Sequence, residues 1–359
     1  MNQLNITNNC TLFDTLCDIK THYSIHNQST LYILGQGFDP RMCESISKIN
    51  DFISEMDIFK LAYAEGSYSP SEKYKHLAEK NTKKLNSIGR DIKIIQVKRN
   101  INLLLFFREK FNIDNLKKKY KRIIVDISAM PQSIFFNLIK YLIFELKRTK
   151  DTIKLDIIIC ENSKLDDAII PTDLSETAKS LSGFDMFSSD LESDENPIPI
   201  WIPLLGKGCA NELEKLYSYI SPQEICPVLP FPSKDPRRSD EILSFLGKHL
   251  FESFSVETRN IIYVAEQNVL DVYSKLYKSI KYYNKVLKII GDPKFFISIG
   301  SSKLIGLGAL LVNLELRRQD ITAAFAVVEN GGYTFDTDKY TPSHNHIYCL
   351  SLNENTYGW

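Results

Sequence analysis

The sequence has no surplus of charge of either sign. Lys and Arg together count 44, and Asp and Glu also count 44, so the formal net charge is zero. Proteins that bind duplex DNA or RNA usually carry a basic surplus that faces the phosphate backbone. We therefore expect no duplex nucleic acid as a partner, and a charged ligand would have to be recognised by a local cluster of residues.

Long apolar runs and cysteine pairs are lacking as well. No stretch reaches the roughly 18 apolar residues that a membrane-spanning helix needs, and the first residues do not resemble a signal peptide. The seven cysteines are scattered, and no two of them have the spacing of metal ligands. This pattern favours a cytoplasmic protein with reduced thiols and without a membrane partner.

Familiar catalytic motifs are also missing. There is no P-loop, no G-x-S-x-G nucleophile elbow and no H-E-x-x-H zinc motif. None of the six histidines has an evident acid or nucleophile partner, and His344-Asn-His346 supplies only two possible metal ligands. We therefore predict no metal and no cofactor other than a nucleotide ligand, and the sequence names no catalytic residue.

What the sequence does contain is the same α/β pattern twice, with a period of about 170 residues. The apolar run 31–34 leads into Gly35-Gln36-Gly37, and the run 201–205 leads into Gly206-Lys207-Gly208. Later apolar runs of the first half also have counterparts, in the same order, in the second half. Ordered recurrence at one period indicates duplication of a whole domain.

These apolar runs are continuous, which is typical of strands buried on both faces of a parallel sheet. The expected strands are 31–34, 61–64, 92–97, 123–127 and 155–160 in the first half, 200–205, 225–229, 261–264, 295–299 and 323–328 in the second, and 347–352 in the tail. Helical segments alternate with the strands, as in doubly wound folds. We therefore predict an α/β protein with two tandem doubly wound, mainly parallel Rossmann-like sheets related by internal duplication.

The expected domain organisation follows from the same pattern. It comprises an N-terminal extension (1–28), Rossmann-like domain 1 (29–163), an acidic Ser-rich linker (164–198), Rossmann-like domain 2 (199–340) and a C-terminal tail with an edge strand (341–359). Two such domains that face each other would form a cleft between their loop faces, where ligands of parallel sheets bind.

The turns after the first strand of each half are candidate ligand sites. They hold Gly35 and Gly37 in the first half, and Gly206, Lys207 and Gly208 in the second. Glycine permits close approach of a ligand to the backbone, but neither turn completes G-x-G-x-x-G, so the dinucleotide fingerprint is absent. In the first half Asp39 and Arg41 follow. They could contact a ligand, or Asp39 could cap a helix that has Pro40 at its first position.

The loops after the fourth strands are the most suggestive. In the second half Gly300, Ser301, Ser302 and Lys303 precede a strongly apolar helix. Hydroxyl groups, the free amides at a helix start and a lysine together suit an anionic oxygen. In the first half Asp126 and Ser128 occupy the same place. For each loop the alternative is ordinary helix capping, by Ser301 or by Ser128.

Two further groups in the second half are candidates. Lys234, Arg237 and Arg238 stand together in a proline-rich loop after the second strand, where they could grip phosphate. The alternative is a surface loop whose arginines are neutralised by neighbouring acids. Glu329 and Asn330 are expected at the end of the fifth strand. A carboxylate there could bind ribose hydroxyls, or it could only solvate the strand end.

The run Gly300-Ser301-Ser302-Lys303 followed by an apolar helix resembles the motif of CARF domains. Two such halves in one chain look like SAVED domains, which are fused CARF-like pairs. Ser128 stands at the matching position of the first half, where Ala129, Met130 and Gln132 depart from the motif. The resemblance implies a Rossmann-like sensor of cyclic oligonucleotides in bacterial antiviral signalling, with the ligand across the two halves.

Together these features predict a sensor or regulatory subunit that binds a phosphate-containing nucleotide in the cleft between its halves. No residues are left over for an effector domain, so a separate effector protein is the expected partner. Two alternatives stay open, namely a hydrolase that acts on a nucleotide with carboxylates of the cleft, and a structural adaptor of a defence complex.

Overall fold

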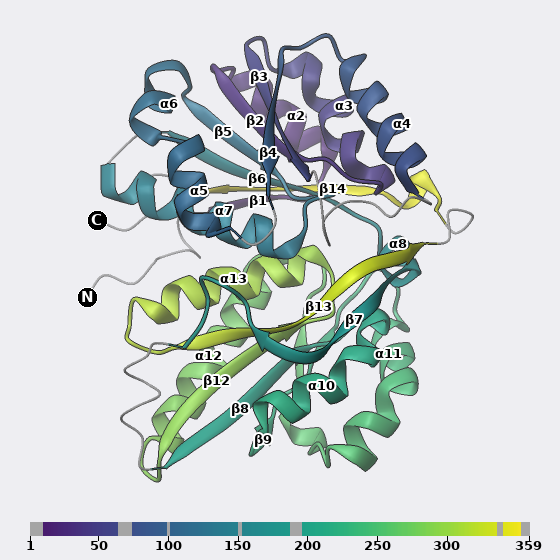
Figure 1. The fold of residues 1–359 in the computed structure, drawn as a ribbon, viewed down its shortest axis with the longest axis vertical. Helices are drawn as coiled ribbons and strands as arrows, with labels where there is room; N and C mark the ends of the chain where they lie inside the picture. Colours follow the sequence, from purple (N-terminus) through teal and green to yellow (C-terminus); the bar gives the residue numbers. More distant parts are fainter. Residues whose placement is uncertain are drawn as a thin grey trace. The chain divides into compact units, whose positions relative to one another are not determined.

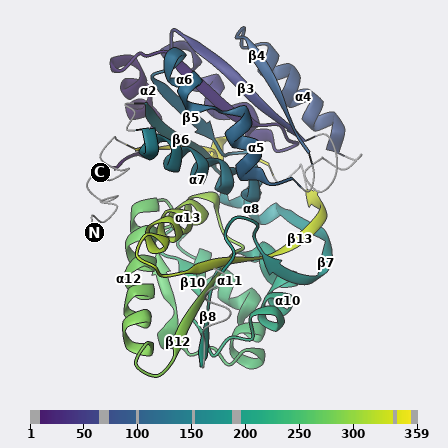
Figure 2. The same ribbon diagram turned by 60° about the vertical axis from the view of Figure 1, so that its left-hand side comes forward.

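The structure is a computed structural model that describes residues 10–63, 74–98, 101–149, 153–186, 196–335 and 340–352. The chain divides into two compact units: unit 1 comprises Met1–Asn162 with Tyr340–Trp359, and unit 2 comprises Ser163–Lys339. Each unit is an α/β domain built on one sheet (Figures 1 and 2). No helix within the described ranges combines the length and the apolar character needed to cross a membrane.

Unit 1 is built on a seven-stranded sheet. Its strands are β1 (Cys10–Phe13), β2 (Thr30–Gly35), β3 (Met56–Tyr63), β4 (Ile92–Val97), β5 (Arg122–Asp126), β6 (Lys154–Glu161) and β14 (His346–Leu352). They are ordered β1-β14-β6-β5-β2-β3-β4. The strands from β2 to β6 are parallel, and β14 is antiparallel to both of its neighbours.

Helices cover both faces of this sheet, which explains why its central strands are apolar throughout. The α-helices are α2 (Leu16–Ile25), α3 (Glu44–Ile49), α4 (Lys75–Asn86), α5 (Leu103–Lys110), α6 (Ile113–Lys119) and α7 (Gln132–Thr149). Ile19 of α2, Ile46 of α3 and Leu85 of α4 join one buried cluster with Leu34 of β2. Right-handed crossovers place α5, α6 and α7 on the other face (Figure 1).

Unit 2 repeats this architecture. Its strands are β7 (Ile169–Ser180), β8 (Pro197–Leu204), β9 (Glu224–Ile225), β10 (Val228–Pro230), β11 (Ile262–Val264), β12 (Asp292–Ile299) and β13 (Ala323–Phe335), and its α-helices are α8 (Ser163–Ala168), α10 (Ala210–Ile220), α11 (Arg238–Gly247), α12 (Val269–Leu287) and α13 (Lys303–Arg317). The sheet order is β11-β10-β8-β12-β13-β7, and the short β9 pairs with β8.

Short helical turns complete the two units. They are the 3-10 segments η1 (Pro40–Cys43), η2 (Asn50–Phe52), η4 (Lys207–Cys209), η6 (Thr258–Asn260) and η8 (Pro342–His344), and the π-helical segment η5 (Lys248–Ser253). Two of them, η1 and η4, directly follow the first parallel strands of their units. They therefore lie where the candidate glycine turns were expected.

Both units have the same strand order, as expected of an internal duplication. The parallel strands run β4-β3-β2-β5-β6 in unit 1 and β11-β10-β8-β12-β13 in unit 2. In both units this is the order third-second-first-fourth-fifth that characterises Rossmann folds. The predicted fold class is confirmed, and β4 has the predicted bounds.

The sixth strands of the two units are exchanged. The strand β7 follows β6 of unit 1 along the chain, but it pairs antiparallel with β13 of unit 2. In the same way β14 follows β13, but it pairs antiparallel with β6 of unit 1. Each sheet is therefore completed by the strand that follows the fifth strand of the other unit.

This exchange explains where the expected domain organisation is wrong. The predicted linker 164–198 begins with α8 and β7, whose edge position leaves most of its side chains partly or fully exposed; residues 187–195 lie outside the described residues. The extension 1–28 supplies β1 and α2 to unit 1. The tail 341–359 supplies β14, which is not an edge strand because β1 pairs along its outer side.

Candidate functional site

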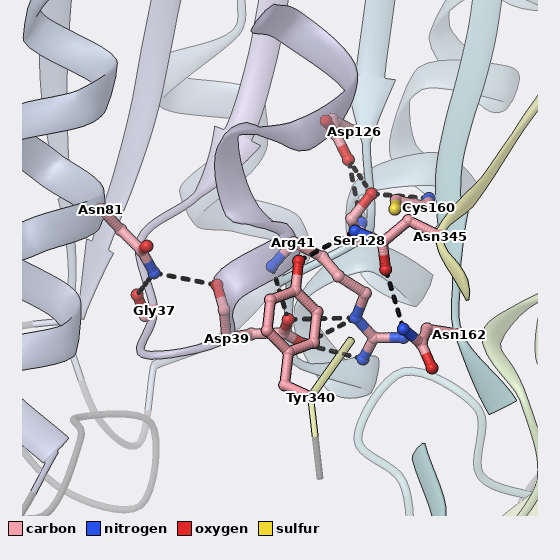
Figure 3. Close-up of polar contacts among 10 residues, drawn as sticks. All are labelled: Gly37, Asp39, Arg41, Asn81, Asp126, Ser128, Cys160, Asn162, Tyr340 and Asn345. Carbon is pink, nitrogen blue, oxygen red and sulfur yellow. Dashed lines mark hydrogen bonds and ion pairs between the residues drawn. The ribbon is translucent and has the colours of Figure 1, made fainter. Parts of the chain in front are cut away.

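The carboxyl edge of unit 1 gathers most of the residues predicted in the first half (Figure 3). The strands β2 and β5 are neighbours. The next strand after β2, which is β3, lies on one side of this pair, and the next strand after β5, which is β6, lies on the other. This is the topological switch point at which open α/β sheets bind ligands. The predicted residues brought together here are Gly35, Gly37, Asp39, Arg41, Asp126 and Ser128.

Asp39 caps η1 and holds the side chain of Arg41. Its carboxylate accepts the backbone N–H of Arg41 at 2.9 Å and the Nε and Nη2 groups of that guanidinium at 3.0 and 2.7 Å. Pro40 occupies the first position of the helical turn, so the capping interpretation is confirmed. The pair is buried, with 8% of Asp39 and 2% of Arg41 exposed. Asp39 therefore fixes the direction of the guanidinium.

The glycine turn is held from α4 by Asn81, which the sequence analysis missed. Its Nδ2 donates to the carbonyl oxygens of Gly37 and Asp39, both at 2.9 Å. Asn81 is buried on the same helix face as Ala78 and Leu85. A polar residue within an apolar helical stripe is the signal that could have revealed it.

Asp126 and Ser128 form a buried hydrogen-bonded pair. Asp126 accepts the hydroxyl of Tyr32 at 2.6 Å and both the backbone N–H, at 3.0 Å, and the hydroxyl of Ser128. The Ser128 hydroxyl oxygen in turn accepts the backbone N–H of Cys160 at 2.8 Å. Burial, reinforced by the charge of Asp126, raises the pKa of Tyr32 well above its usual value, so that the tyrosine remains a donor.

This geometry corrects the expectations for both residues. Ser128 is completely buried and Asp126 is 2% exposed, so neither presents its side chain to a ligand. Ser128 does not cap α7 either, because that helix begins at Gln132. The pair instead ties the loop after β5 to the neighbouring strand β6, since Cys160 belongs to β6.

A chain segment that returns from unit 2 completes the polar cluster. Asn162, directly after β6, donates through Nδ2 to Oδ1 of Asn345 at 2.9 Å and to the carbonyl oxygen of Thr341 at 3.3 Å. Asn345 donates to the hydroxyl of Tyr340 at 2.9 Å. Burial raises the pKa of Tyr340, although the hydrogen bond from Asn345 opposes that shift. Tyr340 and Asn345 are half-buried, whereas Asp126 and Ser128 are buried.

In unit 2 the glycines of the predicted turns are needed for packing. A Cβ atom on Gly206 would lie within 3.0 Å of the carbonyl oxygen of Gly300, and one on Gly300 within 3.0 Å of the Cys209 side chain. Close packing of the loops after β8 and β12 thus accounts for both glycines. Gly208 differs, because the atom nearest to its virtual Cβ is the carbonyl oxygen of Ile169 at 3.7 Å. Lys207 forms an ion pair with Glu241.

The start of α13 is capped by Ser302 rather than by Ser301. The Ser302 hydroxyl accepts the backbone N–H of Ile305 at 3.4 Å. The Ser301 hydroxyl oxygen is buried and has no hydrogen-bond partner among the described residues. Lys303 is the first residue of the helix and is half-buried. Anion binding at this helix start stays a prediction.

Arg238 is buried between two carboxylates, which corrects its predicted role. Its guanidinium donates to both carboxylate oxygens of Asp167, at 2.9 and 3.1 Å, and pairs with Glu266 at 2.6 Å. Only 4% of Arg238 is exposed, so its charge is neutralised inside the unit and does not face a phosphate. Arg237 and Lys234 are exposed, and their predicted roles stay predictions.

Glu329 and Asn330 lie inside β13 instead of after it. Glu329 pairs with Lys179 of β7 at 2.7 Å, and Nδ2 of Asn330 donates to the carbonyl oxygen of Gly332 at 3.0 Å. The predicted position at a strand end is therefore wrong, and a ligand-binding role for the two residues stays a prediction. The reason is that β13 continues to Phe335 as an antiparallel ribbon with β7, whose residues were expected to form a linker.

Glu212 on α10 introduces a pH dependence into unit 2. Burial raises its pKa from 4.5 to about 7, and Lys215 opposes the shift. Between these two values the folded state binds more protons than the unfolded state, so stability falls as the pH rises through this window. We expect Glu212→Gln to raise the free energy of unfolding at about pH 8 by up to about 3 kcal/mol and to have little effect at about pH 4.

Chemical denaturation at the two pH values checks this expectation. The matched control is Glu214→Gln on the same helix, because the Glu214 side chain is 72% exposed and its replacement should change little at either pH. An equal gain for Glu212→Gln at both pH values would show that ionisation of the carboxyl group is not the cause.

Within the described residues there is no group of three or more His, Cys, Asp or Glu side chains that could hold a metal ion. No protein-family model matches the sequence, and no curated protein does either. Among solved structures the chain is similar to a Staphylococcus aureus protein named as a caffeoyl-CoA O-methyltransferase, with 17% identity and a TM-score of 0.23 over 42% of this chain and 57% of that one.

Two other solved structures are similar at the same level. The U34-tRNA thiolase NcsA of Methanococcus maripaludis has 10% identity and a TM-score of 0.21 over 38% of this chain and 51% of that one. A precorrin-6y C5,15-methyltransferase of Geobacter metallireducens has 13% identity and a TM-score of 0.21 over 48% and 81%. The chain thus spans little more than half of the first two structures, and its fold is established by its own strand order.

Proposed function

We propose that the protein is a sensor or regulatory subunit that binds a phosphate-containing nucleotide and acts through a separate effector protein. The observation that carries this proposal is the repeated switch point. Both units have the Rossmann strand order, and both place a glycine turn and a polar loop where neighbouring strands diverge. Sheets of this kind bind their ligands at that place.

Unit 2 supplies groups suited to phosphate. The free amides in the first turn of α13 and the ammonium group of Lys303 favour an anion. Ser301 adds a buried hydroxyl without a partner among the described residues. Unit 1 supplies groups suited to a base or a sugar, because the amide of Asn345 and the hydroxyl of Tyr340 can donate and accept hydrogen bonds.

The resemblance of Gly300-Ser301-Ser302-Lys303 to the CARF motif makes a cyclic oligonucleotide the first ligand class to test. On that basis the proposed setting is bacterial antiviral defence. A ligand shared by both units in one cleft stays a prediction, as does the cytoplasmic location.

The hydrolase alternative has less support from the side chains considered for it. Ser128 is fully buried and bonded to Asp126, which leaves no accessible hydroxyl nucleophile there. Asp39 is held by the guanidinium of Arg41. Its carboxylate oxygens already accept hydrogen bonds from the backbone N–H and the guanidinium of Arg41.

A thermal-shift screen of the full chain against cyclic, linear and mononucleotides tests the proposal. At a hundredfold excess over Kd a bound ligand adds about 2.7 kcal/mol to the free energy of unfolding, which shifts Tm by several degrees. We expect Lys303→Ala to reduce the shift, and the exposed Lys248→Ala to retain it. Absence of a shift with every nucleotide would favour the adaptor alternative, and turnover of the bound nucleotide would favour the hydrolase.

A further inference from the structure

The last turns of α12 extend past the buried face of that helix. Its buried residues recur every three or four positions and are Val269, Val272, Tyr273, Leu276 and Ile280. The helix continues to Leu287, but no residue after Ile280 is buried. Figure 2 shows α12 beside the sheet of unit 2, ending at the turn that leads into β12.

Large apolar side chains are exposed on this extension and on the following turn. Tyr282 is 67% exposed, Val286 43%, Ile289 84% and Ile290 66%. Single exposed apolar residues are common on protein surfaces, whereas four of them within nine positions favour an interaction site.

The turn that carries the two isoleucines is well fixed. The N–H groups of Ile290 and Gly291 donate to the carbonyl oxygen of Leu287 at 2.9 and 3.0 Å. From the other side, Nδ2 of Asn196 donates to the carbonyl oxygen of Ile290 at 2.9 Å. Ile289 and Ile290 are thus exposed on a hydrogen-bonded turn and not on a frayed helix end.

Most of α12 and the following turn are also rich in lysine. Residues 274–291 contain five lysines and no acidic residue. Lys275 pairs with Asp271, and Lys281 donates to Gln319. Lys278, Lys285 and Lys288 are exposed and have no acidic partner among the described residues.

We propose that this basic apolar face, formed by the end of α12 and the turn before β12, binds the surface of an anionic lipid bilayer, which is a partner that the sequence analysis did not expect. Positions 278, 282, 285 and 286 share one side of α12, and Ile289 and Ile290 follow on the turn after it. The isoleucines would enter the boundary between headgroups and acyl chains, while the lysines face lipid phosphates and carboxylates.

A bilayer fits this face better than a second copy of the chain does. In a twofold interface the same patch meets itself, so the unpaired lysines of the two copies would repel each other. An anionic membrane supplies opposite charge and an apolar layer at once. The proposal is independent of nucleotide binding, because none of these residues belongs to the candidate site at the carboxyl edges.

Sedimentation of the full chain with lipid vesicles tests the proposal. We expect binding to phosphatidylcholine vesicles that contain about 30% phosphatidylserine, little binding to pure phosphatidylcholine, and weaker binding as salt rises. The double variant Ile289→Ser with Ile290→Ser should lose binding about tenfold or more. Ile25→Ser is the matched control, since Ile25 is 71% exposed on unit 1.

Charge substitutions test vesicle binding independently of the isoleucines. Lys285→Glu with Lys288→Glu should also abolish binding, whereas Lys80→Glu with Lys83→Glu, on the exposed side of α4, should not. Unchanged Tm values would show that the variants are folded. Wild-type protein that ignores phosphatidylserine vesicles, or isoleucine variants that bind them as wild type does, would overturn the proposal. So would a wild-type dimer in analytical ultracentrifugation that these isoleucine substitutions dissociate.

Discussion

Replacing Gly206 with alanine should destabilise unit 2 by about 3 kcal/mol or more, while the same change at Gly208 should have little effect. A Cβ atom on Gly206 would overlap the backbone carbonyl group of Gly300. A backbone carbonyl cannot rotate away as a flexible side chain can, so the loops after β8 and β12 would have to separate. At Gly208 the nearest atom lies at ordinary contact distance, 3.7 Å.

Urea denaturation of the two variants measures the difference. The pair is closely matched, because both glycines belong to one turn and both receive only a methyl group. Similar stabilities for the two variants would contradict the contact between the loops. A Gly208→Ala variant that keeps its stability but loses a nucleotide-induced shift would assign Gly208 to ligand approach, which is the role first expected for the whole turn.

Arg238→Ala should cost about 3–5 kcal/mol, because it leaves two carboxylates without their shared cation in a buried setting. Asp167 and Glu266 both pair with this guanidinium, and Glu266 is itself 2% exposed. Burial already raises the pKa of Asp167, and Arg238 opposes that rise. Loss of the arginine should therefore favour protonation of the acid and make unit 2 less stable toward neutral pH.

The neighbouring Arg237→Ala is the control, with an expected change within about 0.5 kcal/mol because Arg237 is exposed. Urea denaturation of both variants near neutral pH measures the two changes in the free energy of unfolding. If the two variants had equal stability, the buried network around Arg238 would not be stabilising. Separately, a smaller nucleotide-induced rise in Tm for Arg237→Ala than for the wild type would support a ligand role for this exposed arginine.

Arg237 and Arg238 also show that adjacent residues of the same type can have different roles. Both follow the same proline-rich loop, and both suit phosphate by their chemistry. One of them faces solvent, while the other faces Asp167, which is 71 positions away along the chain. No local pattern indicates that pairing, because it depends on α8 belonging to unit 2.

Sequence patterns alone indicated most of the strands and their order of recurrence, but not β1 or β7. Continuous apolar runs predicted β4 with its observed bounds, and they predicted β5, β6 and β12 to within three residues. Such runs are informative because a strand covered on both faces must be apolar at each position, and this requirement acts within a few neighbouring residues. Helix α6 lacks such a signal, since its seven residues include three lysines and only two apolar side chains, Ile113 and Leu116.

Which strands pair and which distant side chains make contact depended on the tertiary structure. The antiparallel strand β7 is polar, because it lies at an edge, and therefore it looked like a linker. The exchange of β7 and β14 joins segments such as Asn162 and Asn345, which are 183 positions apart. Tertiary structure also places Glu329 within a strand and buries Ser128. Local periodicity determines which segments form strands and helices, but the choice among distant partners depends on packing the whole chain at once.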